Sequence, residues 1–349
     1  MMDSASQSRY RGAFIAPLIA TAALGLSLIA DEAIIRMHVN VNWPWWLNDL
    51  EHVGSAWANR ILSPVALLIA LLIHRPALRH LILALPAQAL LTHLLKFAVG
   101  RVRPADAGES LLFAPFSWIH DGWPSGHSSL AWTIVFAFAL RGSRTTVLWI
   151  ALALYICWAR LHTHAHFPSD LVAGAMVGWI AALTTDQLFH RWIKAGELGQ
   201  PPRRQRGPWR LTALWLAAVV APMAAAMTIG RRAPTASDEA ARGEITTLYE
   251  IYLGREPDVP GLSAYVSQRT AGLPLIAIGR DILDSDESRR RLADHTAPQR
   301  VGILYDLLLH RPPSPAELER DVALVTDLSR RRGRLTLLIM RLTWPESPS

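Results

Sequence analysis

The segment AFIAPLIATAALGLSLIA, residues 13–30, carries no charged side chain over 18 positions. At a rise of about 1.5 Å per residue, a helix of this length crosses the hydrocarbon layer of a membrane. Residues 211–229 have the same character over 19 positions. These two runs predict one transmembrane helix at the start of the chain and another beyond its middle.

Further apolar runs of 13 to 15 residues separate these two, at residues 61–73, 81–95, 128–140, 145–159 and 171–185. Any one of them could be a buried helix of a soluble protein. Five in succession after a membrane anchor favour a membrane bundle, with polar residues extending the helices at an interface or a site. The first run is longer than the apolar part of a secretory signal, and more apolar helices follow, so we expect an uncleaved span.

The predicted fold class is therefore all-α, a polytopic membrane bundle of about six spans plus a seventh. The composition agrees, because 51% hydrophobic and 18% charged residues suit a membrane part joined to a soluble part. We expect a membrane domain at residues 1–190, a basic loop at 191–210, the additional span at 211–229 and a small soluble helical domain at 238–349. The single cysteine, Cys157, allows no intrachain disulfide.

The net charge of +7 is unevenly distributed. If the loops alternate across a membrane, one side holds twelve Lys and Arg before residue 211 and the other holds six. The positive-inside rule then places the N-terminus and loop 191–210 in the cytoplasm, and loops 36–55, 97–127 and 160–170 outside. This distribution argues against nucleic-acid binding. It predicts a multi-pass inner-membrane protein whose site and C-terminal domain face the periplasm, with Trp43, Trp45, Trp46, Trp118 and Trp123 in an interfacial belt.

The C-terminal part contains an internal repeat with an offset of 56 residues. Each copy predicts an apolar helix, a turn with Arg and Pro, and a second helix, which bury their apolar faces against each other. Matching pairs include Tyr249 with Tyr305 and Arg255 with Arg311. The segment LGREPD at 253–258 with Gly261 resembles the DUF4214 family of small helical modules, although the second copy has His310 in place of the glycine. The resemblance implies an interaction module with a protein or envelope partner, and a plain helical spacer fits as well.

The first polar motif is Lys96-x6-Arg103-Pro104, at the outer end of the run at residues 81–95. The second is Pro124-Ser125-Gly126-His127, where Ser125 suits a helix N-cap and the free N–H groups of the first turn suit an anion. In the third, Arg160-x5-His166-x3-Asp170, the histidine and the aspartate share one helix face, so that the carboxylate can fix the imidazole tautomer. Topology places all three motifs on the same side of the membrane.

Each motif alone has an ordinary explanation, such as a snorkelling lysine, a helix start or interfacial polar residues. Together they supply three cations, a Ser–Gly helix start, two histidines and an aspartate, which is a set suited to phosphoryl transfer. In this combination the chain resembles the PAP2 superfamily of phosphatidic-acid-type phosphatases, which also includes acid phosphatases and haloperoxidases, over residues 55–190. The third motif departs from the family, because Ala159 stands where a serine is usual, and we expect a modest effect at most.

By that resemblance, the phosphate-binding residues are Lys96, Arg103, Ser125, Gly126 and Arg160, and the catalytic residues are His166, His127 and Asp170. His166 is the expected nucleophile, Asp170 orients it, and His127 protonates the leaving oxygen and later activates water. No metal or other cofactor is expected. The expected substrate is a lipid phosphate or pyrophosphate held in the bilayer, with a polyprenyl pyrophosphate first and phosphatidylglycerol phosphate or phosphatidic acid next.

Other interpretations remain open at this point. His162, His164 and His166 alternate, and with Asp170, or with His120 and Asp121 of the preceding outer loop, they could bind zinc. That reading leaves Lys96, Arg103 and the Pro-Ser-Gly-His turn unexplained. We expect His162 and His164 at the membrane interface or at the rim of the pocket instead. A phosphotransferase could use the same phosphohistidine, and an inactive scaffold could recruit partners through residues 238–349. For a phosphatase, deletion of residues 238–349 is expected to leave the chemistry largely unchanged.

Overall fold

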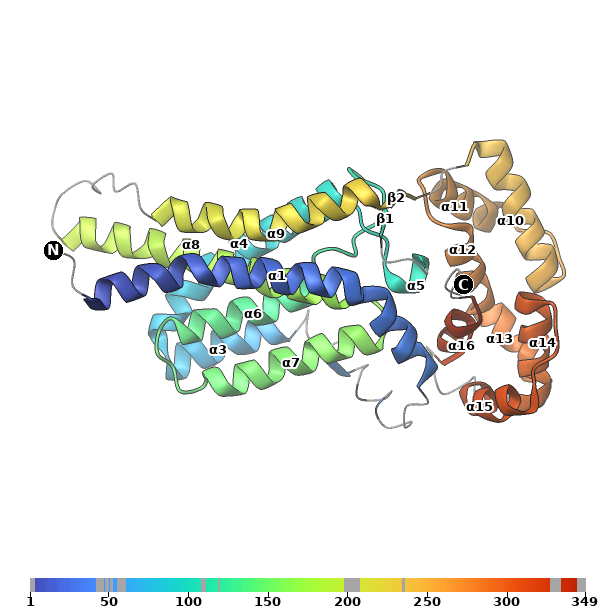
Figure 1. The fold of residues 1–349 in the computed structure, drawn as a ribbon. Helices are drawn as coiled ribbons and strands as arrows, with labels where there is room; N and C mark the ends of the chain where they lie inside the picture. The colour runs from blue at the N-terminus through green and yellow to red at the C-terminus, as the bar shows by residue number, and fades with distance from the viewer. Residues whose placement is uncertain are drawn as a thin grey trace.

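A computed structural model describes residues 4–41, 47, 50, 53–54, 61–107, 111–118, 120–197, 208–233, 236–326 and 334–343. The chain forms an elongated helical bundle with a second group of helices at one end (Figure 1). The described residues outside the helices include two strands of two residues each, so the predicted all-α class is confirmed. Trp43, Trp45 and Trp46, predicted for the interfacial belt, lie outside the described residues.

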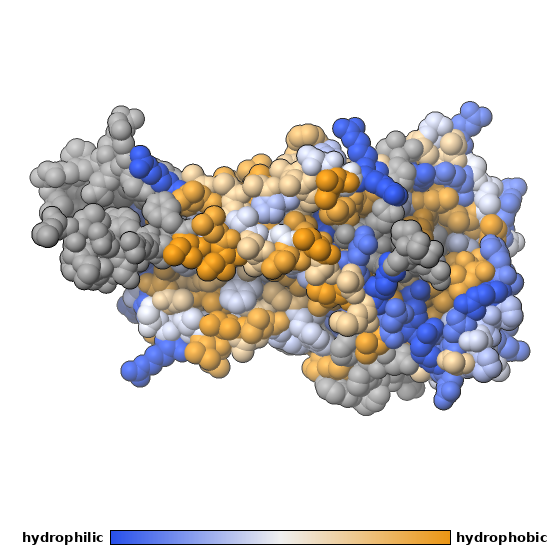
Figure 2. Space-filling model, in the orientation of Figure 1, coloured by the Kyte–Doolittle hydropathy of each residue, from blue (hydrophilic) through white to orange (hydrophobic). Residues whose placement is uncertain are grey.

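The bundle consists of the helices that the apolar runs predict. Each helix contains its run, apart from one residue at one end in some cases, and several helices extend beyond it. They are α1 (Ser4–Asn40), α3 (Leu62–Ile73), α4 (Arg75–Val99), α6 (Gly126–Ala139), α7 (Thr146–His162), α8 (Pro168–Glu197) and α9 (Pro208–Ile229). Figure 2 shows apolar side chains over the visible face of the bundle and mostly hydrophilic ones over the second group of helices. Exposed leucines and isoleucines on α1, α3 and α4 suit contact with lipid.

The lengths of the bundle helices differ. By length and composition, four described helical segments can cross a membrane: Ile15–Asn40, Arg75–Val99, Pro168–Leu188 and Arg210–Ile229. Helices α3 and α7 are apolar but shorter. The predicted loop at 191–210 differs from the structure, because α8 continues to Glu197 and α9 begins at Pro208.

Helix α6 lies at the centre of the bundle and packs against α4, α7 and α8. Its contact with α8 is close because glycine faces it. A Cβ atom added at Gly174 would lie 2.7 Å from the carbonyl oxygen of Ser125 and 2.7 Å from Cβ of Ser128. The start of α6 and the start of α8, which carry the second and third motifs, are therefore held against each other.

Short elements connect the long helices, and two of them lie between α4 and α6 in the sequence. They are helix α5 (Pro104–Ala107), strand β1 (Leu112–Phe113) and, after α9, strand β2 (Arg231–Arg232), which pairs with β1 in parallel. These elements lie at the end of the bundle that faces the second group of helices (Figure 1). The pairing ties the end of α9 to the loop that follows the first motif.

The second group of helices, here called the tail, contains α10 (Asp238–Leu253), α11 (Val259–Thr270), α12 (Leu275–Leu283), α13 (Asp286–Ala293), α14 (Ala297–Leu309), α15 (Pro315–Val325) and α16 (Arg334–Thr343). The predicted repeat is confirmed in α10–α11 and α14–α15. Gly254 and His310 both end a helix in the left-handed conformation. Arg255 and Arg311 lie over the rings of Tyr249 and Tyr305, at 5.2 Å and 5.4 Å.

The tail packs directly on the bundle. One buried apolar cluster joins Ile35 and Val39 of α1 and Phe167, next to His166, to tail residues such as Leu338. Arg280 donates to the carbonyl oxygen of Ala105 at 2.7 Å, so α12 is also fixed to helix α5. The tail therefore packs against the predicted membrane domain of its own chain as well as within itself.

Two tryptophans predicted for the interfacial belt behave differently. Trp118 is 67% exposed and stacks on Phe97, with ring centroids 4.6 Å apart, which suits an interfacial position. Trp123 is fully buried in a cluster with residues of α1, α8 and α9, so its assignment to the belt was wrong.

Candidate active site

The first motif lies where α4 ends. Gly100 terminates the helix in the left-handed conformation, with φ of 56°, and its N–H donates to the carbonyl oxygen of Lys96 at 2.8 Å. A Cβ atom at this position would lie 1.8 Å from the carbonyl oxygen of Ala114, so only glycine fits. The chain then reverses and brings Arg103 beside Lys96, where both cations contact the carboxylate of Asp121.

The second motif begins α6. The Ser125 side chain accepts a hydrogen bond from the N–H of Ser128, as an N-cap does, and Ser125 is fully buried. Gly126 and His127 line the cavity described below. The structure therefore places Gly126 and His127 at the cavity, whereas Ser125 does not line it and caps α6 instead.

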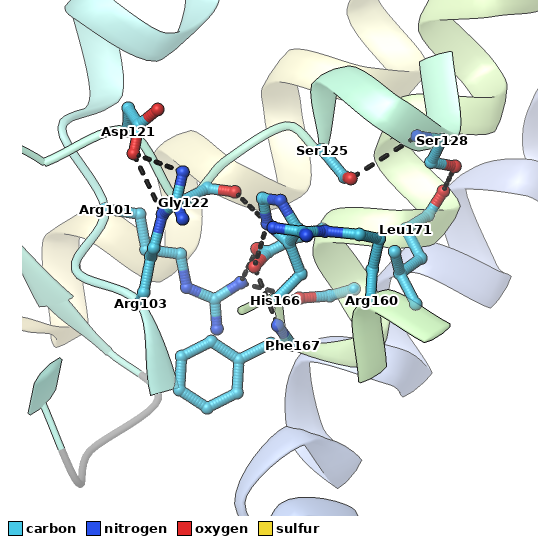
Figure 3. A network of polar contacts seen from close by, with 12 residues as sticks. Arg101, Arg103, Asp121, Gly122, Ser125, Ser128, Arg160, His166, Phe167 and Leu171 are labelled. Carbon is cyan, nitrogen blue, oxygen red and sulfur yellow. Dashed lines mark hydrogen bonds and ion pairs between the residues drawn. The ribbon is translucent and has the colours of Figure 1, made fainter. Parts of the chain in front are cut away.

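The third motif spans the end of α7, the loop of residues 163–167 and the start of α8. Arg160 comes from α7, and its side chain extends toward the ring of His166 (Figure 3). Asp170 lies in the first turn of α8, and its Oδ2 is 3.5 Å from Nδ1 of His166. The spacing of four residues places both groups on one side of the turn, as predicted.

The tautomer of His166 follows from its neighbours. Its Nδ1 lies 2.8 Å from the carbonyl oxygen of Gly122, closer than to Asp170. A carbonyl oxygen can only accept, so Nδ1 carries the proton and Nε2 holds the lone pair. The carbonyl oxygen of Gly122 thus contacts Nδ1 more closely than Asp170, which the sequence predicted to orient His166 and whose carboxylate also lies nearby.

The charge state of His166 is set by burial and by cations. Burial lowers the pKa of His166 well below its usual range, and Arg103, Arg160, Lys96 and His127 lower it further. The imidazole is therefore neutral at physiological pH. A buried neutral histidine surrounded by cations has the properties of a nucleophile for an anionic group.

Five of the predicted site residues line one cavity of about 610 Å³, whereas Ser125, Arg160 and Asp170 lie outside its lining. Its polar end is formed by Lys96, Arg103, Asp121, Gly126, His127 and His166. Motif residues separated by up to 70 positions thus come together at one end of the bundle, beside the tail. The site combines fixed cations, a neutral imidazole and a second histidine, and so it can bind and attack a phosphate group.

A buried ionic network behind His166 was not foreseen from the sequence. Arg101 is fully buried and donates to Asp170 at 2.6 Å and to Asp31 of α1 at 2.6 Å. Asp31 also accepts from the backbone N–H of Ser169 at 2.9 Å. A charged residue within the first apolar helix was the available signal, because ionisable residues inside spans are usually paired.

His162 and His164 do not lie at the pocket rim, contrary to expectation. Both are buried, and Nδ1 of His162 shares a hydrogen bond of 2.8 Å with Nε2 of His38. The pKa of His164 is lowered to about 3 by burial and by the neighbouring histidines. Across the described residues, no three His, Cys, Asp or Glu side chains form a group that could hold a metal ion.

The fold and the site define a helical membrane protein with a cavity lined by Lys96, Arg103 and a buried histidine. Residues 77–194 match the family model of the PAP2 superfamily. The match covers the three motifs and helices α4 to α8. The similarity of the tail to the DUF4214 family stays a prediction.

Several known proteins are similar to this segment. The chain is 41% identical over 100 residues to a lipid A 1-phosphatase of Rhizobium etli, which covers 27% of this chain and 43% of that protein. It is 43% identical over 101 residues to a lipid A 1-phosphatase of Rhizobium johnstonii, covering 27% and 41%. It is 35% identical over 65 residues to the bacitracin transport permease protein BcrC of Bacillus licheniformis, covering 19% and 32%.

The chain thus spans less than half the length of the curated relatives it matches. No solved structure matches it. The family match and the two lipid A 1-phosphatases support a phosphatase, and the apolar helices support a multi-pass membrane protein.

Proposed function

We propose that this protein is a membrane lipid phosphatase that works through a phosphohistidine on His166. The observation that carries the proposal is the convergence of a neutral, buried His166 with the cations Lys96 and Arg103 on one cavity. Three positive side chains, with Arg160, neutralise a phosphate and the charge that develops on it during transfer.

In the first step, Nε2 of His166 attacks phosphorus, and the bond from phosphorus to the lipid oxygen breaks. His127 gives a proton to that leaving oxygen. The phosphohistidine ring is positively charged, and the Asp170 carboxylate, 3.5 Å from Nδ1, stabilises it. Acid–base help of this kind contributes roughly 10²–10⁴-fold to a rate.

In the second step, His127 takes a proton from water as the water oxygen attacks phosphorus. The bond from phosphorus to Nε2 breaks, and inorganic phosphate and neutral His166 are released. The reaction is therefore a hydrolysis in which the protein returns to its starting state.

A lipid substrate is favoured by the other wall of the cavity. Below the cations, the cavity is bounded by Leu85, Pro86 and Ala89 of α4 and by Leu130 of α6. The neighbouring residues Leu90 and Leu94 of α4 are exposed, and their apolar side chains suit contact with lipid. A phosphate at the polar end therefore leaves room for an apolar chain to lie along α4.

The substrate class is a lipid phosphate or pyrophosphate at the outer face of the inner membrane. A polyprenyl pyrophosphate remains the first candidate, and phosphatidylglycerol phosphate and phosphatidic acid follow. The similarity to lipid A 1-phosphatases adds lipid A phosphorylated at its 1 position. The positive-inside charge distribution supports a periplasmic site and tail.

A substrate panel in detergent tests the lipid part of the proposal. Phosphate release would be measured from the four lipids and from a soluble aryl phosphate. Each buried CH₂ contributes about 0.8 kcal/mol, so at least one lipid should show kcat/KM about tenfold or more above the soluble ester. Equal values for all substrates, with the aryl phosphate as good as any lipid, would contradict a lipid-binding cavity.

A further inference from the structure

The cavity contains an anion of its own. Oδ1 of Asp121 accepts hydrogen bonds from Arg103, at 2.9 Å from Nε and 2.8 Å from Nη2. Oδ2 lies 3.1 Å from Nζ of Lys96, which also donates to the backbone carbonyl oxygen of Asp121. One carboxylate therefore joins the two cations that the proposed function assigns to the phosphate, and Figure 3 shows it beside Arg103.

The carboxylate is ionised and reachable. Burial alone raises the pKa of Asp121, but Arg103 and Lys96 outweigh burial and hold this pKa below its usual range. Its side chain is 43% exposed, against 12% for Lys96, so it covers the cation from the open side of the cavity. An incoming anion can therefore displace it without unfolding the surrounding loop.

A carboxylate and a phosphate present the same feature to such a cation pair, namely two oxygens that accept from an arginine fork and an ammonium group. The two anions cannot both hold Lys96 and Arg103 in this geometry. If the substrate phosphate binds here, the ion pairs of Asp121 must break first or be shared.

We propose that Asp121 is an internal competitor for the phosphate group, and that it sets how tightly this site holds substrate and product phosphate. This inference rests on the proposed function. In the free protein the carboxylate satisfies Lys96 and Arg103. When phosphate binds, it takes over these contacts, and when phosphate leaves, Asp121 returns and assists its release.

The consequence is a specificity for the strongest anions. A phosphate monoester or pyrophosphate has more negative charge to offer than a phosphodiester or a carboxylate, so only the former displaces Asp121 readily. Removal of the competitor strengthens binding of ground states and transition state alike. It therefore lowers KM, and it slows turnover where phosphate release limits the rate.

The test is Asp121→Asn, which keeps the shape and removes the charge. Binding of inorganic phosphate and of orthovanadate would be measured by calorimetry on the full-length protein in detergent, without turnover. Without the competing charge, phosphate affinity should rise about tenfold or more. KM for the lipid substrate should fall as well.

Asp186→Asn is the matched control. Asp186 forms an ion pair of 2.5 Å with Arg141 and does not line the cavity, so phosphate affinity should stay as in the wild type. Unchanged or weaker phosphate binding by a folded Asp121→Asn protein overturns the inference and makes Asp121 a structural clamp for the two cations. If wild type binds phosphate and the variant gains nothing, the proposed function still stands. If no protein of the series binds phosphate, the phosphate site itself fails too.

Discussion

At the scale of the residue, His166 is controlled by groups from four segments of the chain. Gly122 fixes the proton on Nδ1, and burial together with Arg103, Arg160 and Lys96 keeps the ring neutral. The same cations that the proposed function assigns to the phosphate thus also lower the pKa of His166. A change in one of them should alter both phosphate binding and the pH dependence of the reaction.

The pH profile tests this coupling. Since the pKa of His166 lies below its ordinary value of 6.5, the neutral nucleophile persists as the pH falls through 6.5. The acid limb of kcat/KM, which reports the free enzyme, should therefore lie below pH 6.5 in the wild type. Arg103→Gln removes a cation, so the pKa should rise and the acid limb should move to higher pH.

Substrate titration is the same in both proteins, so the difference in midpoint reports the enzyme. Activity will fall in Arg103→Gln for lack of a phosphate contact, and only the midpoint is compared. A midpoint that stays in place or moves to lower pH would show that Arg103 does not act on the nucleophile.

The residues of the site differ in how far sequence could predict them. Fixed spacings identified Lys96, His127 and His166, because each motif is local and its chemistry is recognisable. Asp31 and Arg101 form an ion pair across 70 positions, and nothing in either local sequence indicates the partner. Asp121 was weighed as a metal ligand, and its pairing with Lys96 became visible only in three dimensions.

At the scale of the element, the apolar runs predicted the bundle helices well, because a membrane helix must be apolar along its whole length. The docking of the tail could not be predicted, because it depends on surfaces that meet only after folding. Helix α16 lies against α1, where Arg341 donates to the carbonyl oxygen of Val39 at 3.0 Å and 2.8 Å. Helix α12 reaches helix α5 through Arg280.

Deletion of the tail is therefore expected to impair catalysis, in contrast to the expectation from sequence. Without residues 238–349, Phe167 loses part of its apolar cluster, and the loop that holds His166 loses support. Displacement of a catalytic group by about 1 Å can cost about 10²-fold in rate. Phosphate release by the truncated protein should fall by about that factor, with the melting temperature lowered.

A point variant covers the case in which the truncated protein does not fold. Arg280→Met removes the hydrogen bond to Ala105 and should lower kcat more than it raises KM. Arg242→Met, on an exposed face of α10, is the matched control and should leave both unchanged. Full activity in the truncated protein and in Arg280→Met would show that the tail is independent of the site.

At the scale of the whole molecule, the three motifs and the tail lie at the same end of the bundle, opposite the start of α1 (Figure 1). The alternating loop assignment from the sequence predicted this relative arrangement, because each span carries the chain from one end of the bundle to the other. Residues of α3 and α4 line the cavity, and the tail packs against Phe167, next to His166. This arrangement suits a reaction at a membrane surface, with the lipid chains left in the bilayer.

The most direct test of the account is to trap the phosphorylated intermediate. Protein would be mixed with a substrate carrying a radioactive phosphate, quenched in alkali after milliseconds, and assayed for protein-bound label, with and without EDTA. The account predicts label on wild type in both conditions, stable to alkali and lost in acid as for phosphohistidine, and none on His166→Ala. Three results would contradict the histidine mechanism: turnover without any bound label, label that remains on His166→Ala, or loss of both turnover and label from the wild type with EDTA.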